Sequence, residues 1–271
     1  MTSQSSVPSG ASHSASKPAP RLILASASPA RKKLLEDSGI MFDIHVSDVD
    51  EDAALASAAQ RAREEGRTDL TPAEVSGILA EAKARAVADS LAAQGIVNAF
   101  VLGCDSVFEF ESVAYGKPHT PEKARERIAA MSGRSGVLHT GHCLVDLRDG
   151  LGETEGKQLP AIHQVRSATV NFAPMSAAEV DAYVATGEPL HVAGSFTLDG
   201  YGAAFIQGIR GESHTVIGLS VNALKEMLSQ YGISISFFWK SSSDSSPLSF
   251  SFFLLSFPGL SAGLEARSPS S

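Results

Sequence analysis

The sequence has few cysteines and no excess of basic residues. Its two cysteines, Cys104 and Cys143, are too few for a disulfide framework, and neither lies in a spacing typical of zinc ligands. With 22 Lys and Arg against 30 Asp and Glu, the formal net charge is −8. An acidic chain lacks the basic face that nonspecific binding to nucleic acid requires. We therefore expect an intracellular protein without a structural metal or a nucleic-acid partner.

Long apolar runs are also lacking. The longest uncharged, apolar-looking stretch of the C-terminal region, 247–260, is interrupted by serines and by Pro258. A membrane helix needs about 20 apolar residues, so we expect no membrane partner. Residues 1–20 are rich in Ser, Ala and Pro and lack the apolar core of a secretory signal. These features favour a cytoplasmic protein, with an organelle transit peptide as the alternative for residues 1–20.

Three regions differ in composition. Residues 1–20 cannot bury enough apolar surface to fold, so we expect a disordered N-terminal extension. Residues 234–271 are rich in Ser and Phe, and we expect either a disordered tail or a stretch foreign to the ancestral domain. Residues 21–233 alternate strand and helix signals and predict a single α/β domain around a mixed sheet. We expect strands at 21–25, 99–108, 137–147, 167–172 and 203–209, and helices at 29–38, 72–95, 121–132, 177–186 and 221–230.

A first motif, 26–33, reads Ser-Ala-Ser-Pro-Ala-Arg-Lys-Lys at the start of a predicted helix. Free backbone N–H groups, serine hydroxyls and the cations beginning at Arg31 together form a cradle suited to phosphate. The alternative is that Ser28 only caps the helix and that the cations form a solvated face.

Acidic groups gather in two further places. Residues 48–52 hold four carboxylates, among them Glu51, a set that suits Mg²⁺ or else forms an acidic surface loop. Asp105 ends an apolar strand, where the active sites of α/β sheets lie, although such an Asp often only forms a turn.

Two turns complete the candidate residues. Gly116 and Pro118 restrict the backbone around Lys117 and so limit where its ammonium group can point. The alternative is an ordinary solvated lysine in a turn. The glycine-punctuated segment 193–202 carries Asp199 and predicts either the wall of a ligand pocket or a plain hairpin connection.

The order and spacing of these motifs resemble those of the Maf-type nucleoside triphosphate pyrophosphatases, once named septum-formation inhibitors. The resemblance spans residues 21–232 and rests on LILASASPARKKLL, SDVDE, EAKARAVA, VLGCDSV, YGKP, SGRSGVLHTGHCLV, TGEPLHVAGSF and VIGLS. It implies an α/β domain with an elongated mixed sheet flanked by helices and a cleft between two lobes. It further implies hydrolysis of nucleoside triphosphates to monophosphate and pyrophosphate with a divalent metal, usually Mg²⁺, and homodimers are common in the family.

The resemblance also assigns roles to individual residues. It implies that Asp105 accepts a proton from the attacking water and that Glu51 and Asp105 hold the metal. Ser28, Arg31, Lys83 and Lys117 fall at positions that bind the triphosphate.

Base selectivity is where this chain departs from the family pattern. Members selective for dTTP and UTP carry Arg, Thr and Gln where this sequence has Ala30, Ser106 and Asp199. An ionised Asp only accepts hydrogen bonds, which disfavours a thymine or uracil carbonyl and favours the N–H groups of guanine or cytosine. We therefore expect removal of non-standard or excess nucleotides without pyrimidine selectivity.

Two other functions fit parts of the sequence. A non-catalytic nucleotide-binding regulator of septum formation would bind nucleotide without turnover. An inosine or xanthosine triphosphate pyrophosphatase would share the chemistry but carries different motifs.

Overall fold

The computed structural model describes residues 19–46, 48–148 and 158–241. Residues 1–18 and 242–271, which hold most of the two expected extensions, lie outside the described residues. Within the described residues the strands are β1 (Arg21–Leu24), β2 (Asp43–Ile44), β3 (Ala99–Phe110), β4 (Val113–Tyr115), β5 (Ser135–Asp146), β6 (Ala161–Phe172) and β7 (Ile206–Arg210). The α-helices are α1 (Pro29–Asp37), α2 (Glu51–Glu64), α3 (Pro72–Ala93), α4 (Pro121–Met131), α5 (Ala177–Ala185), α6 (Ser213–Ile217) and α7 (Val221–Gln230). Short 3₁₀ helices are η1 (Glu188–His191), η2 (Ala193–Ser195), η3 (Tyr201–Phe205) and η4 (Ile235–Phe238).

The seven strands form one mixed sheet in the order β2-β1-β3-β5-β6-β7, with β4 also paired to β3. β1 runs parallel to both β2 and β3, whereas the other pairs are antiparallel. The prediction of an α/β domain around a mixed sheet is therefore confirmed.

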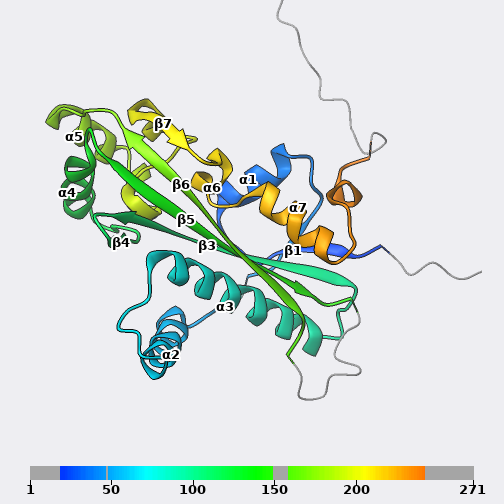
Figure 1. Cartoon of the computed structure of the whole chain (residues 1–271). Coiled ribbons are helices and arrows are strands. Elements are labelled where there is room, and N and C mark those ends of the chain that lie inside the picture. Colours follow the sequence, from blue (N-terminus) through cyan, green and yellow to red (C-terminus); the bar gives the residue numbers. More distant parts are fainter. Residues whose placement is uncertain (1–18, 47, 149–157, 242–271) are drawn as a thin grey trace, which may run out of the picture. The chain divides into compact units, whose positions relative to one another are not determined.

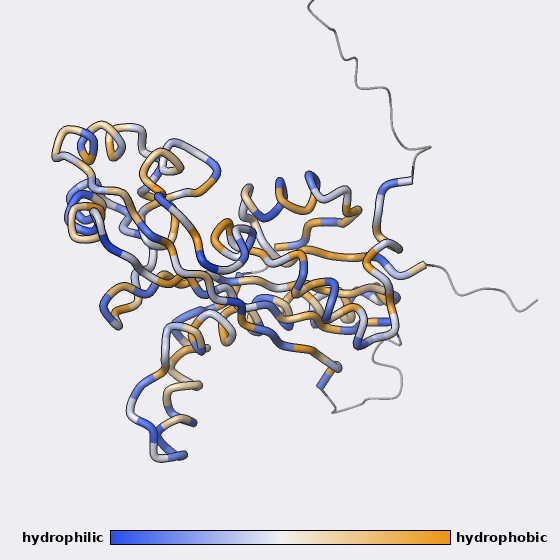
Figure 2. The backbone as a smooth tube through the Cα atoms, turned by 45° about the horizontal axis from the view of Figure 1, so that its top comes forward, coloured by the Kyte–Doolittle hydropathy of each residue, from blue (hydrophilic) through white to orange (hydrophobic). Residues whose placement is uncertain are grey.

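Helices cover both faces of this sheet (Figure 1). α3 lies along one face, where its alanines pack on Ile23 and Val101. α1 and α7 lie on the opposite face against Leu24 and Phe100, while α4 and α5 pack around Phe108. Hydrophobic stretches follow the strands and the helix sides that face them (Figure 2). Because strand side chains alternate between faces, neighbouring residues of β1 and β3 supply different cores.

Local signals in the sequence explain most helix starts. Thr71 and Glu74 form a capping box at α3, and Ser176 and Glu179 form another at α5, as expected. Ser28 caps α1 through a hydrogen bond to the backbone N–H of Arg31.

Two expected elements differ from the structure. The strand expected at 203–209 begins only at Ile206, because Tyr201–Phe205 form a 3₁₀ helix. Helix α2 was not expected at all, and its buried residues are the alanines Ala58 and Ala62.

The first residues of the expected tail pack on the domain. Phe238 of η4 is 3% exposed and lies edge-on to Phe100, and Ile40 forms a β-bridge with Trp239. The packed part of the chain therefore extends to Trp239, beyond the expected boundary at residue 233. No helix among the described residues is long and apolar enough to span a membrane.

Candidate active site

The site lies at a gap in the hydrogen bonding of β3. β5 pairs with one edge of β3 over Phe100–Glu109. On the other edge, β1 pairs up to Leu102 and β4 pairs from Phe108 onwards. Within the described part of the chain, no strand pairs with residues 103–107 at this edge. The gap therefore follows the carboxyl end of parallel strand β1, where the sites of α/β sheets form.

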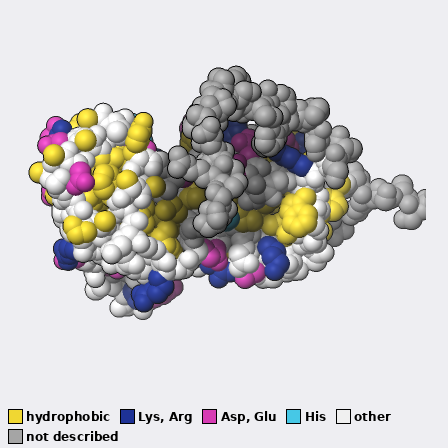
Figure 3. All heavy atoms as spheres, turned by 90° about the horizontal axis from the view of Figure 1, so that it is seen from above, with side chains coloured by type: hydrophobic (Ala, Val, Ile, Leu, Met, Phe, Trp, Pro, Cys, Tyr) yellow, Lys and Arg dark blue, Asp and Glu magenta, His cyan; other side chains and the backbone are white. Residues whose placement is uncertain are grey.

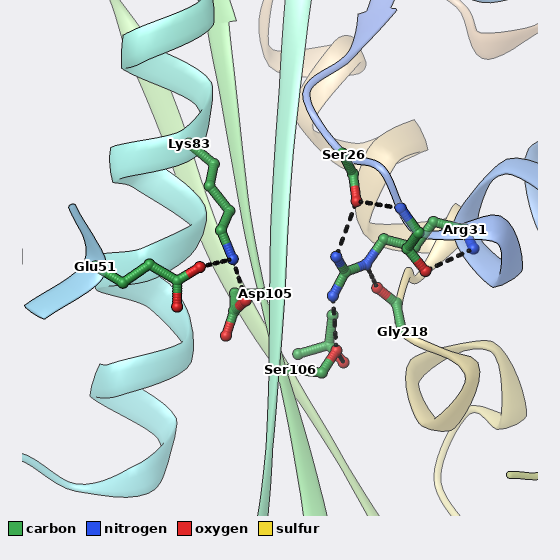
Figure 4. A network of polar contacts seen from close by, with 9 residues as sticks. Ser26, Arg31, Glu51, Lys83, Asp105, Ser106 and Gly218 are labelled. Carbon is green, nitrogen blue, oxygen red and sulfur yellow. Dashed lines mark hydrogen bonds and ion pairs between the residues drawn. The ribbon is translucent and has the colours of Figure 1, made fainter. Parts of the chain in front are cut away.

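Two adjacent residues of this unpaired stretch face opposite sides of the sheet. Asp105 points toward α3, and Ser106 points toward α1, as strand alternation requires (Figure 4). The gap thus gives a ligand access to groups from both faces of β3.

Glycines bring α3 unusually close to the sheet. A Cβ atom at Gly103 would lie 2.2 Å from the backbone oxygen of Ala80, and one at Gly141 would lie 2.2 Å from that of Ser76. Only residues without a side chain fit there. This close packing sets the height at which Lys83, one turn further along α3, meets Asp105.

Lys83 joins two carboxylates from different elements (Figure 4). Its Nζ lies 2.5 Å from Oδ1 of Asp105 and 2.9 Å from Oε1 of Glu51, the first residue of α2. Burial lowers the pKa of Lys83, but the two carboxylates outweigh it and the net pKa is raised. The ammonium group is therefore charged at neutral pH.

Arg31 is held on the other face of β3. Its Nε donates to the carbonyl of Gly218 at 2.7 Å, and its terminal nitrogens donate to Oγ of Ser26 at 3.1 Å and of Ser106 at 3.2 Å. Three of its five N–H donors are thereby used to fix the guanidinium. The other two donate to no acceptor within the described residues, so they can serve a ligand.

The loop that supplies the Gly218 carbonyl is itself anchored by a buried histidine. His142 is 1% exposed, and its Nε2 accepts a hydrogen bond of 2.8 Å from the backbone N–H of Ser220. Burial, together with the charges of Arg31 and Arg166, lowers the pKa of His142 to about 4. A neutral imidazole is what this contact requires, since a protonated Nε2 cannot accept.

Lys117 lies in the turn between β4 and α4. The carbonyl of Gly116 accepts a hydrogen bond of 2.6 Å from Arg127, whose guanidinium also stacks over the ring of Tyr115 at 4.8 Å. These contacts fix the backbone on the N-terminal side of the lysine.

The residues singled out in the sequence converge on one cleft of about 790 Å³. Residues from 191–199 supply another part of its wall, so the glycine-punctuated segment forms a pocket wall and not a plain hairpin. The candidate residues that line it are Ser28, Ala30, Arg31, Glu51, Lys83, Asp105, Ser106, Lys117 and Asp199.

The acidic run at 48–52 does not act as one cluster. Asp50 caps α2 by accepting from the backbone N–H of Ala53, and Glu51 is the member of the run that lines the cleft. Among the described residues, no three His, Cys, Asp or Glu side chains form a group that could hold a metal ion. Glu51 and Asp105 nevertheless suit Mg²⁺, which proteins often hold through one or two carboxylates together with substrate phosphates.

Two residues of the site were missed in the sequence. Thr140 of β5 contacts Ser106 from within the sheet, and Glu188 of η1 accepts hydrogen bonds from the loop that carries Asp199. A threonine inside a strand and a glutamate after a helix end carry no sequence signal of such contacts.

The fold and the cleft together define an α/β protein whose site lies beyond the carboxyl end of a parallel strand, with Lys83 and its two carboxylates on one face of β3 and Arg31 on the other. The chain belongs to the Maf-like protein family, whose sequence model matches residues 21–231. It is 44% identical over 222 residues to a protein of Saccharopolyspora erythraea, covering 81% of this chain and 97% of that one. It is 43% identical over 219 residues to one of Nocardia farcinica, covering 81% and 96%. Both relatives are named nucleoside triphosphate pyrophosphatase.

Proposed function

We propose that this protein hydrolyses nucleoside triphosphates to nucleoside monophosphate and pyrophosphate. The observation that carries the proposal is the meeting of Asp105, Lys83 and Arg31 in one cleft. The volume of about 790 Å³ lies within the range of small-molecule sites and suits a nucleotide. The names of the relatives from Saccharopolyspora erythraea and Nocardia farcinica support the same activity.

Phosphate binding is the proposed role of the cations. A triphosphate carries about four negative charges, so a chain of net charge −8 must concentrate positive charge locally. Arg31 keeps two donors for phosphate oxygens, and Lys83 and Lys117 add ammonium groups from other elements. Ser28, at the start of α1, adds a hydroxyl where the helix dipole favours anions.

Glu51 and Asp105 are the residues that would hold Mg²⁺. When bound, the metal supplies positive charge that stabilises the phosphate oxygens as the anhydride bond breaks. The fit rests on two carboxylates that approach the same Lys83 ammonium and are therefore close to each other.

Asp105 is the proposed proton acceptor. Its carboxylate takes a proton from a water molecule whose oxygen forms a new bond to phosphorus, and the anhydride bond between the first and second phosphates breaks. Nucleoside monophosphate and pyrophosphate are the products. Lys83 orients the carboxylate, and Arg31 stabilises charge on the phosphate oxygens.

Base selection is the role proposed for Ala30 and Asp199. Both line the cleft, and neither belongs to the Lys83–Asp105 pair. A carboxylate at Asp199 accepts from N–H groups, so guanine or cytosine nucleotides are favoured over those of thymine or uracil. Ser106, which the resemblance also links to base choice, has its hydroxyl engaged by Arg31 and Thr140. For Ser106 we therefore propose positioning of Arg31.

The cellular role proposed is removal of non-standard or excess nucleotides in the cytoplasm. The resemblance also suggests a homodimer. Size-exclusion chromatography with light scattering tests this by measuring the mass of the protein in solution.

Pyrophosphate release from a panel of nucleoside triphosphates, with and without Mg²⁺, tests this function. The panel includes dTTP, UTP, CTP, GTP, inosine triphosphate and 7-methyl-GTP. Release that depends on Mg²⁺ supports the proposal. Nucleotide binding without release from any member would contradict it and favour a non-catalytic regulator, whereas preference for inosine triphosphate would favour the related pyrophosphatase class.

A further inference from the structure

A single carboxylate organises one wall of the cleft without lining it. Glu188, in η1, accepts hydrogen bonds from the hydroxyl of Tyr183 at 2.9 Å and from the backbone N–H groups of Tyr201 at 2.9 Å and Gly202 at 3.0 Å. Its Oε1 also accepts from the hydroxyl of Thr197. Four donors, three of them from the segment 197–202, therefore converge on one side chain.

The segment is wrapped closely around this carboxylate. A Cβ atom at Gly200 would lie 2.3 Å from Oε2 of Glu188, and one at Gly202 would lie 2.6 Å from the hydroxyl of Tyr183. Tyr183 is 3% exposed, and its hydroxyl also accepts from the backbone N–H of Thr197 at 3.2 Å. The glycines thus permit an approach that any side chain would block.

The charge on Glu188 is retained in this setting. Burial raises the pKa of Glu188, but the hydrogen bonds from Thr197, Gly202, Tyr201 and Tyr183 outweigh it, and the net pKa is lowered. Hydrogen bonds to an ionised acceptor are stronger than those to a neutral one.

The segment that Glu188 holds supplies cleft residues from a part of the chain far from the phosphate-binding motif at 26–33. Phe196, Thr197, Leu198 and Asp199 all line the cleft, whereas Glu188 and Tyr183 do not. Glu188 therefore acts on a ligand only through the loop.

We infer that Glu188 is the positioning residue of the loop 196–202 and thereby sets how tightly the cleft binds the nucleoside part of its substrate. This inference rests on the proposed function. Glu188 has no contact with the Lys83–Asp105 pair in the described structure, so it governs affinity and leaves the bond-breaking step unchanged.

The test uses Glu188→Gln in the full chain, which keeps the size of the side chain and removes its charge. Hydrogen exchange at the amides of Tyr201 and Gly202 is expected to accelerate about tenfold, since each donates to the carboxylate. KM for the best triphosphate of the panel is expected to rise about tenfold with kcat within about twofold.

Tyr183→Phe is the second variant, because it removes one donor to Glu188 and keeps the buried ring. A smaller rise in KM, about threefold, is expected. Glu179→Gln is the matched control: Glu179 also accepts from a backbone N–H and a hydroxyl, both of Ser176, but it caps α5 outside the cleft. Its KM is expected to equal that of the wild type.

Three results would overturn the inference: unchanged amide exchange in Glu188→Gln, a fall in kcat at constant KM, or an equal rise in KM in Glu179→Gln. A wild-type protein that hydrolyses no triphosphate would instead contradict the proposed function. The holding of the loop by Glu188 would then be decided by exchange alone, with faster exchange supporting it and unchanged exchange overturning it.

Discussion

Thr140 determines the direction in which the hydroxyl of Ser106 points. Oγ1 of Thr140 donates its one hydrogen to the carbonyl of Thr215 at 2.8 Å, so it can only accept from Ser106, 2.9 Å away. Oγ of Ser106 in turn accepts from Arg31. The carbonyl of Thr215 thus fixes the direction of the hydrogen bonds that run from the Arg31 guanidinium through Ser106 and Thr140.

Replacing Thr140 by Val should break this chain without changing the volume of the side chain. The buried carbonyl of Thr215 loses its donor, and an unsatisfied buried polar group lowers the free energy of unfolding by about 1–3 kcal/mol. KM for the triphosphate should rise, since Arg31 loses an oriented partner. Urea unfolding and steady-state kinetics measure the two effects, Thr140→Ser serves as the control, and a Val variant with wild-type KM would refute the link to Arg31.

Asp105→Asn tests the proton acceptor. We expect turnover to fall by about 10²–10⁴-fold, because the amide cannot take a proton from water. The fold should remain, since Lys83 keeps its contact with Glu51. Asp52→Asn is a suitable control because Asp52 belongs to the acidic run but does not line the cleft. Wild-type turnover in the Asp105 variant would exclude it as the base.

The buried His142 predicts a loss of stability in acid. Its pKa is about 4 in the folded protein against 6.5 for an ordinary histidine, so the unfolded chain binds a proton more readily. Stability is therefore complete above about pH 6.5 and declines as the pH falls towards 4, by about 3 kcal/mol in total.

Urea unfolding at about pH 7 and about pH 4.5 measures this loss in the wild type and in His142→Gln. The wild type should lose about 2–3 kcal/mol more than the variant, which has no titrating ring. Equal losses in both proteins would assign the acid sensitivity to other groups.

Two neighbouring phenylalanines at the start of the expected tail differ in burial, so their substitutions test whether this part of the chain packs on the domain. Phe238 is 3% exposed and Phe237 is 45% exposed. Phe238→Ala should lower the free energy of unfolding by about 3–5 kcal/mol, whereas Phe237→Ala should change it by about 0.5 kcal/mol. Thermal and urea unfolding provide the comparison, and equal effects would show that η4 does not pack as described.

The sequence predicted the α/β class and most helix starts because capping residues and apolar spacing are local signals. The sequence does not predict α2, because its buried residues, Ala58 and Ala62, cannot be distinguished by hydrophobicity from the other alanines of the helix. The sequence predicts a start for β7 that is too early, because Ala203 and Phe205 resemble strand residues. The hydrogen bonds of the loop to Glu188 favour a 3₁₀ turn there.

The candidate residues were found through order and spacing along the chain, and they do lie in one cleft. Their chemical roles stay predictions. The sequence could not reveal which groups Asp105 and Ser106 meet on their own faces of β3, or that Thr140 and Glu188 hold other site groups in place. Such contacts join residues far apart in the chain, and no local propensity encodes them.

The uninterrupted pairing of β3 with β5 makes the site intolerant of any change in strand length. Ten consecutive residues, Phe100–Glu109, pair one to one with β5. Inserting or deleting one residue ahead of Asp105 would turn the acid towards Arg31 and the hydroxyl of Ser106 towards Lys83, since each step along a strand reverses the face. The length of this one strand is therefore fixed by the need to keep the acid and the hydroxyl on their own sides of the sheet.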